Sequence, residues 1–134
     1  MKEELTLDAT TENIEEVTAF IDAYLEKIDC PMHEQMQIDV AVDELFSNIA
    51  NYAYFPNVGK ATVDIDVADG KVIIRFTDGG VPYNPLEKED PDIKAKAEDR
   101  EIGGLGIFMV KKMMDEISYE YRDEKNILTV VKNI

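Results

Sequence analysis

The sequence predicts an α+β two-layer sandwich, in which helices cover one face of a mixed, mostly antiparallel sheet. Two observations carry this prediction. Apolar and polar residues alternate in short runs near both ends of the chain and in its middle, which is the period of a half-buried strand. Apolar residues at spacings of three and four, the period of a helix face, separate those runs. The resulting order is strand, helix, helix, strand, strand, loop, helix, strand, strand, which is typical of helices segregated to one face of a sheet.

Length and composition favour one packed domain over residues 1–134. A chain of 134 residues, 45% of them hydrophobic and 32% charged, can bury a substantial core. Lys and Arg number 14 against 29 Asp and Glu, which leaves a formal net charge of −15. Such an acidic surface repels phosphate backbones and anionic lipid headgroups, so we expect no direct binding to nucleic acid or membrane. The charge either serves solubility or favours a basic protein partner.

Cysteine usage and the absence of targeting signals favour a cytoplasmic location. Cys30 is the only cysteine, so no disulfide can form within the chain, which fits a reducing compartment. Residues 1–4 lack the apolar core of a signal peptide. The apolar run over 102–110 is far shorter than the ~18 residues that a membrane-spanning helix needs.

The first half of the chain predicts a strand followed by two helices. Leu5, Leu7 and Ala9 alternate with polar residues and indicate the strand. Thr10 or Thr11 can cap the first helix. One apolar stripe at helical spacing runs along that helix: Ile14, Val17, Ile21, Leu25 and Ile28. A second helix is expected over about 33–54, after the break at 29–31.

The second half predicts a hairpin, a long loop, a helix and a second strand pair. Asp69-Gly70 separates two alternating runs and predicts a tight hairpin, because both central residues of such a turn need φ above zero. Residues 79–103 show no period, and a loop of roughly 20 residues in a compact domain is usually functional or disordered. Helical spacing resumes at Leu105. One strand is expected to start at Tyr119, and the last strand is expected over 127–131. A turn at 123–126 separates the two strands.

Glu44 and Asn48 form the first candidate site. They lie one helical turn apart in the second predicted helix, with Cβ atoms about 5–6 Å from each other. Asn supplies a neutral oxygen that suits Mg²⁺, and Glu can orient a hydroxyl and accept its proton. The alternative is a solvated helix face. We expect Tyr52 and Tyr54 to cap the helix packing rather than to stack on a base.

Two glycine-bearing segments form the rest of the candidate site. Asp78 ends a strand before Gly79-Gly80, so its carboxylate either closes a simple turn or accepts from the amine of a flat base lying close to glycine. The segment 103–106, Gly-Gly-Leu-Gly, opens a helix, where free amides suit a phosphate. The sequence lacks the Lys-Ser/Thr ending of a Walker loop and the His-Arg-Asp and Asp-Phe-Gly loops of protein kinases.

Together and in this order, the three segments resemble the N, G1 and G2 boxes of the Bergerat-fold (GHKL) ATPases. Asp78, Gly80 and Pro82 match the Asp-x-Gly-x-Pro of the G1 box. Residues 39–54, DVAVDELFSNIANYAY, and 103–116, GGLGIFMVKKMMDE, are further similar to the anti-sigma-factor serine/threonine kinases of bacteria. The resemblance covers nearly the whole chain.

This resemblance implies roles for particular residues. Glu44 matches the general base, and Asn48 matches the magnesium ligand. Asp78 matches the carboxylate that reads the adenine, and Thr129 matches a polar residue near the adenine. Three glycines match those that cradle the nucleotide: Gly80, Gly104 and Gly106. Arg100 matches an arginine of the lid. The segment over about 84–102 corresponds to an ATP lid.

The resemblance also implies a function. It is that of a kinase using ATP and Mg²⁺ to phosphorylate a serine or threonine of a small anti-anti-sigma protein of the STAS type, sequestering a sigma factor, usually as a homodimer. The chain departs from the family pattern in two places. Asn84 stands where an aspartate is usual, and the first helix holds no arginine, which the partner-binding face of the family often uses. The alternatives are a non-catalytic ATP-binding module for partner switching and a detached ATP-binding domain of a signalling kinase.

Overall fold

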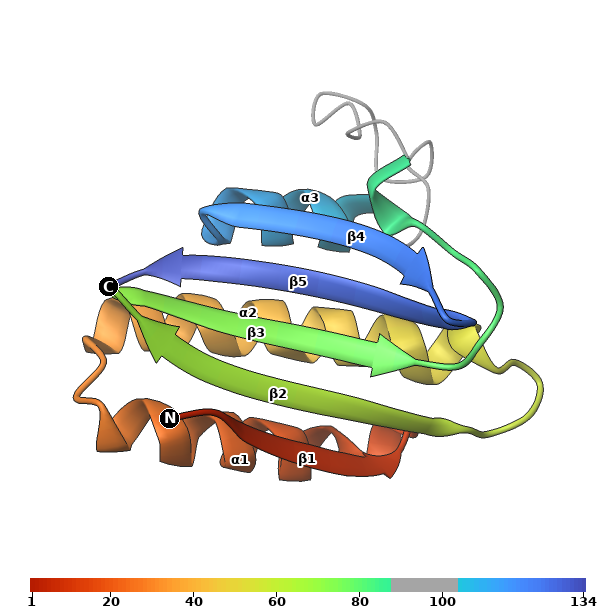
Figure 1. Cartoon of the computed structure of the whole chain (residues 1–134), viewed down its shortest axis with the longest axis horizontal. Coiled ribbons are helices and arrows are strands. Elements are labelled where there is room, and N and C mark those ends of the chain that lie inside the picture. The colour runs from red at the N-terminus through yellow and green to blue at the C-terminus, as the bar shows by residue number, and fades with distance from the viewer. Residues whose placement is uncertain (88–103) are drawn as a thin grey trace.

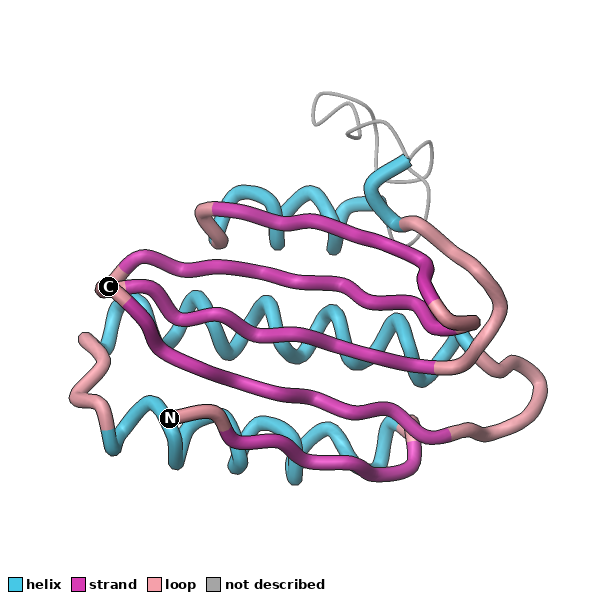
Figure 2. The backbone as a smooth tube through the Cα atoms, viewed as in Figure 1, coloured by secondary structure: helices cyan, strands magenta, loops and turns pink. Residues whose placement is uncertain are grey.

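The computed structural model describes residues 1–87 and 104–134 and has two layers, a five-stranded sheet and a set of helices (Figure 1). The strands are β1 Glu3–Asp8, β2 Lys60–Ala68, β3 Lys71–Asp78, β4 Glu116–Arg122 and β5 Lys125–Asn133. The helices are α1 Ile14–Lys27, α2 Met32–Asn48 and α3 Gly104–Met113. All three lie on the same face of the sheet, as Figure 2 shows. The predicted order of elements and the single helical layer are confirmed.

The sheet has the strand order β1-β2-β3-β5-β4, and every pair of neighbours is antiparallel. A mixed sheet was expected, and no parallel pair occurs among the strands that the structure describes. The connections explain the difference. Two antiparallel helices join β1 to β2, so the chain re-enters the sheet in the opposite direction. A single helix does join β3 to β4, but β5 folds back between these two strands and separates them.

The core lies between the sheet and the helices and follows the predicted periodicities. On α1 the stripe residues Val17, Ile21 and Leu25 are fully buried. Alternate residues of β3 face the same core, including Ile74 and Phe76. Burying such side chains stabilises a domain by about 1.5–3 kcal/mol each, so this interface holds the two layers together.

Both hairpins turn through residues with positive φ. Asp69 and Gly70 have φ of 53° and 72°, as the Asp-Gly signal predicts. Asp123 and Glu124, between β4 and β5, have φ of 54° and 62° without a glycine. The predicted Thr10 or Thr11 cap on the first helix is wrong. A 3₁₀ turn over Thr11–Asn13 precedes α1, and no side chain caps either helix start.

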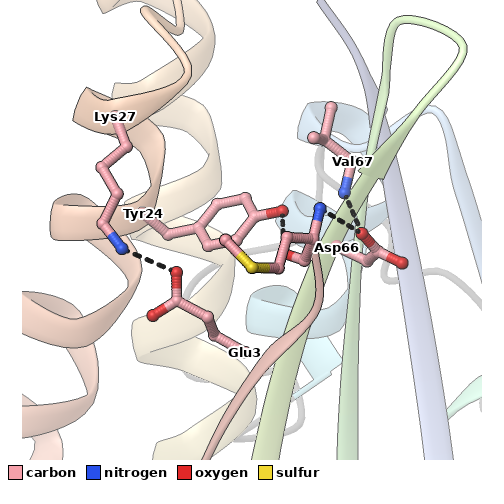
Figure 3. Close-up of polar contacts among 6 residues, drawn as sticks. Glu3, Tyr24, Lys27, Asp66 and Val67 are labelled. Carbon is pink, nitrogen blue, oxygen red and sulfur yellow. Dashed lines mark hydrogen bonds and ion pairs between the residues drawn. The ribbon is translucent and has the colours of Figure 1, made fainter.

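Polar contacts tie the N-terminal edge of the sheet to its neighbours (Figure 3). The Tyr24 hydroxyl donates to the carbonyl of Met1 at 2.7 Å, and Lys27 on the same helix pairs with Glu3 at 2.8 Å. The terminal amine lies 3.4 Å from the Asp66 carboxylate of β2. These contacts anchor an edge strand that has a neighbour on one side only.

None of the helices in the described parts of the chain has both the length and the apolar character that crossing a bilayer requires.

Candidate functional site

A cleft opens between the C-terminal end of α2 and the strands β3, β4 and β5. The end of α2 and the ends of these strands lie on the right of Figure 1. Its volume is about 490 Å³, including the open space at its mouth. Apolar and aromatic side chains form most of the wall, and three polar side chains interrupt it: Asn48, Asp78 and Asn126. Such a wall suits a flat, mostly apolar ring that carries a few polar edge groups.

Asp78 holds one oxygen in place and leaves the other available. It is the last residue of β3 and is 6% exposed. Its Oδ1 accepts hydrogen bonds from the Gly80 amide at 2.9 Å and from Asn126 Nδ2 at 3.0 Å. No hydrogen bond to Oδ2 comes from residues 1–87 or 104–134. Because Asp78 lines the cleft, Oδ2 is the oxygen that can accept from an amine bound there.

The helix that carries Asn48 changes geometry beside the cleft. After α2 ends at Asn48, a π-helical turn over Ile49–Ala53 continues it, where the sequence predicted one helix to residue 54. Such turns occur mostly as local bulges and frequently at functional sites. Here the turn brings Tyr52, which is half exposed, to the cleft wall. Tyr52 therefore belongs to the wall of the cleft and is not a packing cap.

Tyr54, by contrast, does hold the packing together. Its hydroxyl donates to the Lys60 carbonyl at 2.5 Å and accepts from the Gly79 amide at 2.8 Å, which links β2 to the loop after Asp78. Gly59 leaves room for its ring, since a Cβ there would overlap it.

Gly80 is required by the close approach of that same π-helical turn. A Cβ on Gly80 would overlap the carbonyl oxygen of Ala53. The next residue, Val81, donates its amide to that same oxygen at 3.0 Å. Gly80 therefore lets the loop after β3 dock on the end of the α2 segment and close one side of the cleft. Its predicted contact with a nucleotide stays a prediction.

Glu44 lies against α3 rather than in the wall of the cleft. It is half-buried, and a Cβ on Gly106 would overlap its carboxylate. Within the described residues no group donates a hydrogen bond to it. Burial, and next the neighbouring Asp43 carboxylate, raise the pKa of Glu44. A more basic carboxylate without a donor is suited to accept a proton.

The position of Asn48 and its side-chain contacts suit a metal ligand. It lies one turn after Glu44, lines the cleft, and its side chain has no hydrogen-bond partner among the described residues. In the same part of the chain, no cluster of three or more His, Cys, Asp or Glu side chains could hold a metal ion. Mg²⁺ bound mainly through phosphates and waters needs no such cluster, so a single carboxamide oxygen fits it.

Thr129 does not reach the cleft, which corrects the expectation that it lies near a bound base. It alternates along β5 with Leu128 and Val130, which are buried under the helices, so its side chain points to the other face of the sheet. Its cross-strand neighbours there are Arg75 and Ser118. The β5 residues that do line the cleft are Asn126 and Leu128.

Asn126 is the site residue that the sequence reasoning missed. It is 7% exposed and lies directly across from Asp78 in the β3–β5 register. The only sequence signal was a polar residue at the start of the last strand, read as part of a turn.

Of the remaining predictions, Gly104 begins α3, and Arg100 with most of the expected lid (88–102) lies outside the described residues.

Comparison with known proteins agrees with this geometry. A family model described as a histidine kinase-like ATPase domain matches residues 7–132. The anti-sigma F factor of Caldanaerobacter subterraneus is 25% identical over 125 residues, covering 93% of this chain and 87% of the relative. The serine/threonine-protein kinase BtrW of Bordetella bronchiseptica is 26% identical over 97 residues, covering 72% and 68%.

A solved structure extends the agreement to the fold. The crystal structure of the RsbU and RsbW domains of Rv1364c from Mycobacterium tuberculosis matches with a TM-score of 0.72 and 20% identity. The match covers 99% of this chain and 32% of that chain. Since one family model matches residues 7–132, which is nearly the whole chain, the chain belongs to the histidine kinase-like ATPase domain family.

Proposed function

We propose that this protein is an ATP-dependent serine/threonine kinase and an anti-sigma regulatory factor, which phosphorylates a small anti-anti-sigma partner of the STAS type. One observation carries the proposal: a mostly apolar cleft exposes the second carboxylate oxygen of Asp78 and the carboxamide of Asn48, and neither group has a hydrogen-bond partner among residues 1–87 and 104–134. Relatives named as an anti-sigma F factor and as serine-protein kinases support the regulatory part of the proposal.

In this proposal the adenine enters the cleft and its exocyclic amine donates to Asp78 Oδ2. The phosphates extend toward the start of α3, where Gly104 and Gly106 offer backbone amides free of side chains. Mg²⁺ held by Asn48 and phosphate oxygens would neutralise charge that develops during transfer.

Glu44 then acts on the incoming serine. Its carboxylate orients the hydroxyl and accepts the proton as the serine oxygen attacks the γ-phosphorus, and ADP leaves. The raised pKa of Glu44 strengthens it as a base. Because Glu44 lies beside Gly106 rather than in the wall around Asp78, the reacting end of ATP is separated from the base-binding end.

The proposal includes further features. The chain works as a single domain over 1–134 with a lid over about 84–102, from which Arg100 reaches the phosphates. It forms a homodimer in the cytoplasm, binds a sigma factor there, and so regulates transcription without touching DNA. The net charge of −15 favours partners with basic surfaces.

Phosphoryl transfer to a purified anti-anti-sigma protein tests the proposal. With Mg-ATP, the wild-type protein should add phosphate to one serine or threonine, detected by mass spectrometry. Glu44→Gln should lower the transfer rate by about 100-fold or more while binding a fluorescent ATP analogue normally. Glu34→Gln, at the opposite end of α2, is the matched control and should transfer at the wild-type rate.

Two results would contradict the proposal at different points. Normal transfer by Glu44→Gln removes Glu44 from the reaction. ATP binding without phosphate on any partner favours the alternative, a non-catalytic ATP-binding module for partner switching.

A further inference from the structure

A closed hydrogen-bond network around Asn126 lies at the floor of the cleft. Asn126 Nδ2 donates to Asp78 Oδ1 at 3.0 Å, to the Val81 carbonyl at 2.9 Å and, at a longer 3.4 Å, to the Gly80 carbonyl. Its Oδ1 accepts from the Tyr83 amide at 3.1 Å and from the Tyr119 hydroxyl at 2.5 Å. One buried side chain thus joins β3, β4, β5 and the loop that closes the cleft.

The partners allow only one orientation of the Asn126 amide. A backbone amide such as that of Tyr83 can only donate, so it must face the oxygen. The carbonyl of Val81 and the carboxylate of Asp78 can only accept, so both must face the nitrogen. Turning the amide over would set oxygen against oxygen at two places and nitrogen against a donor at a third.

Tyr119 secures this orientation from the neighbouring strand. Burial raises the pKa of Tyr119, so its hydroxyl keeps its proton and acts as the donor toward Asn126 Oδ1. Its ring also lines the cleft. Replacing the hydroxyl alone would release one anchor of the amide and leave the wall almost unchanged.

Two consequences follow for a ligand in the cleft. Asp78 Oδ1 is engaged twice, by Gly80 and Asn126, so the carboxylate cannot turn freely and Oδ2 keeps one direction. The two N–H bonds of the Asn126 amide are also occupied, by Asp78 and by the backbone carbonyls after it. The network therefore presents an acceptor and withholds a neutral donor.

We infer that Asn126, anchored by Tyr119, is a positioning residue that sets the base selectivity of the cleft. It aims the Asp78 carboxylate at the 6-amino group of a purine, and its own amide N–H groups are engaged and so are withheld from the 6-oxo group of inosine or guanine. This inference rests on the proposed function, because it assumes that a purine nucleotide occupies the cleft. A 6-oxo purine would set its carbonyl oxygen against the carboxylate. Two acceptors would then face each other without a hydrogen bond, which weakens binding.

Competition binding with ATP and inosine triphosphate (ITP) tests the inference, because the two differ at the edge that Asp78 faces. A fluorescent ATP analogue serves as the probe. The ratio of the two Kd values is compared between the wild type, Asn126→Ala and Tyr119→Phe. We expect the preference for ATP over ITP to fall about 10-fold in Asn126→Ala and about fivefold in Tyr119→Phe.

Two control variants keep the same chemistry away from the network. Tyr121→Phe removes a hydroxyl from the same strand as Tyr119, at a half-exposed position. Thr129→Val alters β5 on the opposite face of the sheet. Both should keep the wild-type ratio within about twofold. Should Asn126→Ala fail to fold, Tyr119→Phe carries the test alone.

The outcomes separate the inference from the function on which it rests. If the variants weaken ATP and ITP equally, so that the ratio stays at the wild-type value, Asn126 is only structural and the inference is overturned while the proposed function stands. If the wild type binds neither nucleotide, the proposed function fails and the inference falls with it.

Discussion

At the scale of single residues, the distance to the neighbouring backbone decides whether a glycine can be replaced by a larger residue. Gly79 and Gly80 are adjacent in the sequence, yet their surroundings differ. A Cβ on Gly80 would overlap the Ala53 carbonyl, whereas the nearest atom to a Cβ on Gly79 is the Tyr54 hydroxyl, at an ordinary 3.6 Å. The two glycines therefore form a matched pair for mutation.

We predict that Gly80→Ala lowers the free energy of unfolding by about 1–3 kcal/mol, because the π-helical turn and the loop after β3 must separate to admit the methyl group. Gly79→Ala should change it by less than about 0.5 kcal/mol. Urea unfolding followed by circular dichroism measures both. Equal effects of the two variants would mean that the Ala53 contact does not hold the loop.

The residue scale also shows where sequence reasoning succeeds and fails. Asp78 and Asn48 could be predicted because each belongs to a local motif, and the structure brings both to the cleft. Asn126 could not, since its partnership with Asp78 depends on a register between strands far apart in the chain. Thr129 was misplaced for a related reason: a shift of one residue along a strand moves a side chain to the opposite face.

At the scale of elements, the contact between α1 and α2 contains an unusual acidic pair. Gln35 of α2 donates to Asp22 of α1 at 3.2 Å. Asp39, one turn further along α2, has a buried Oδ1 without a partner in the described residues. Burial, and next the neighbouring Asp22 carboxylate, raise the pKa of Asp39 to about 7. Near neutral pH this interface therefore takes up a proton that the unfolded chain would release.

The sign of the resulting pH dependence follows from that proton. Between the ordinary carboxyl pKa of 3.8 and about 7, the folded state holds the proton on Asp39 and the unfolded state does not. This group therefore makes the protein more stable as pH falls from 8 toward 5, and the contribution is lost as pH rises through about 7.

We predict that Asp39→Asn removes this part of the pH dependence and stabilises the protein at pH 8 by about 1 kcal/mol, a value reduced because the pair is partly exposed to solvent. The Asn amide can donate to Asp22 at any pH. Urea midpoints at pH 5 and pH 8 measure the effect, and Asp43→Asn, at an exposed position on the same helix, is the control. Identical pH profiles for Asp39→Asn and the wild type would contradict the shared proton.

Elements as a whole could be predicted better than their ends. The periods of two and 3.6 residues locate the strands and helices because one face of each is buried. Ends depend on contacts that the sequence does not display. The π-helical turn over Ile49–Ala53 is stabilised by a hydrogen bond from the Val81 amide, and Val81 follows in the chain only after a hairpin. No local sequence pattern could therefore predict this turn.

At the scale of the whole molecule, the cleft joins the two layers of the fold. Its wall combines the end of α2 with three strands and with the loop after β3. A ligand bound there contacts both layers at once, and it cannot bind the unfolded chain in the same way. Binding should therefore raise the stability of the entire domain.

Thermal unfolding with and without nucleotide turns this into a prediction. ATP at 100 times its Kd, with Mg²⁺, should stabilise the protein by about 2.7 kcal/mol and raise Tm by roughly 10 °C. Removing Mg²⁺ with EDTA should reduce the shift. In Asn48→Ala the shift should be small and no longer respond to EDTA, because the proposed metal ligand is gone. Asn51→Ala, at an exposed position in the π-helical turn that follows Asn48, should behave like the wild type. An EDTA response that persists in Asn48→Ala would place the metal on other residues.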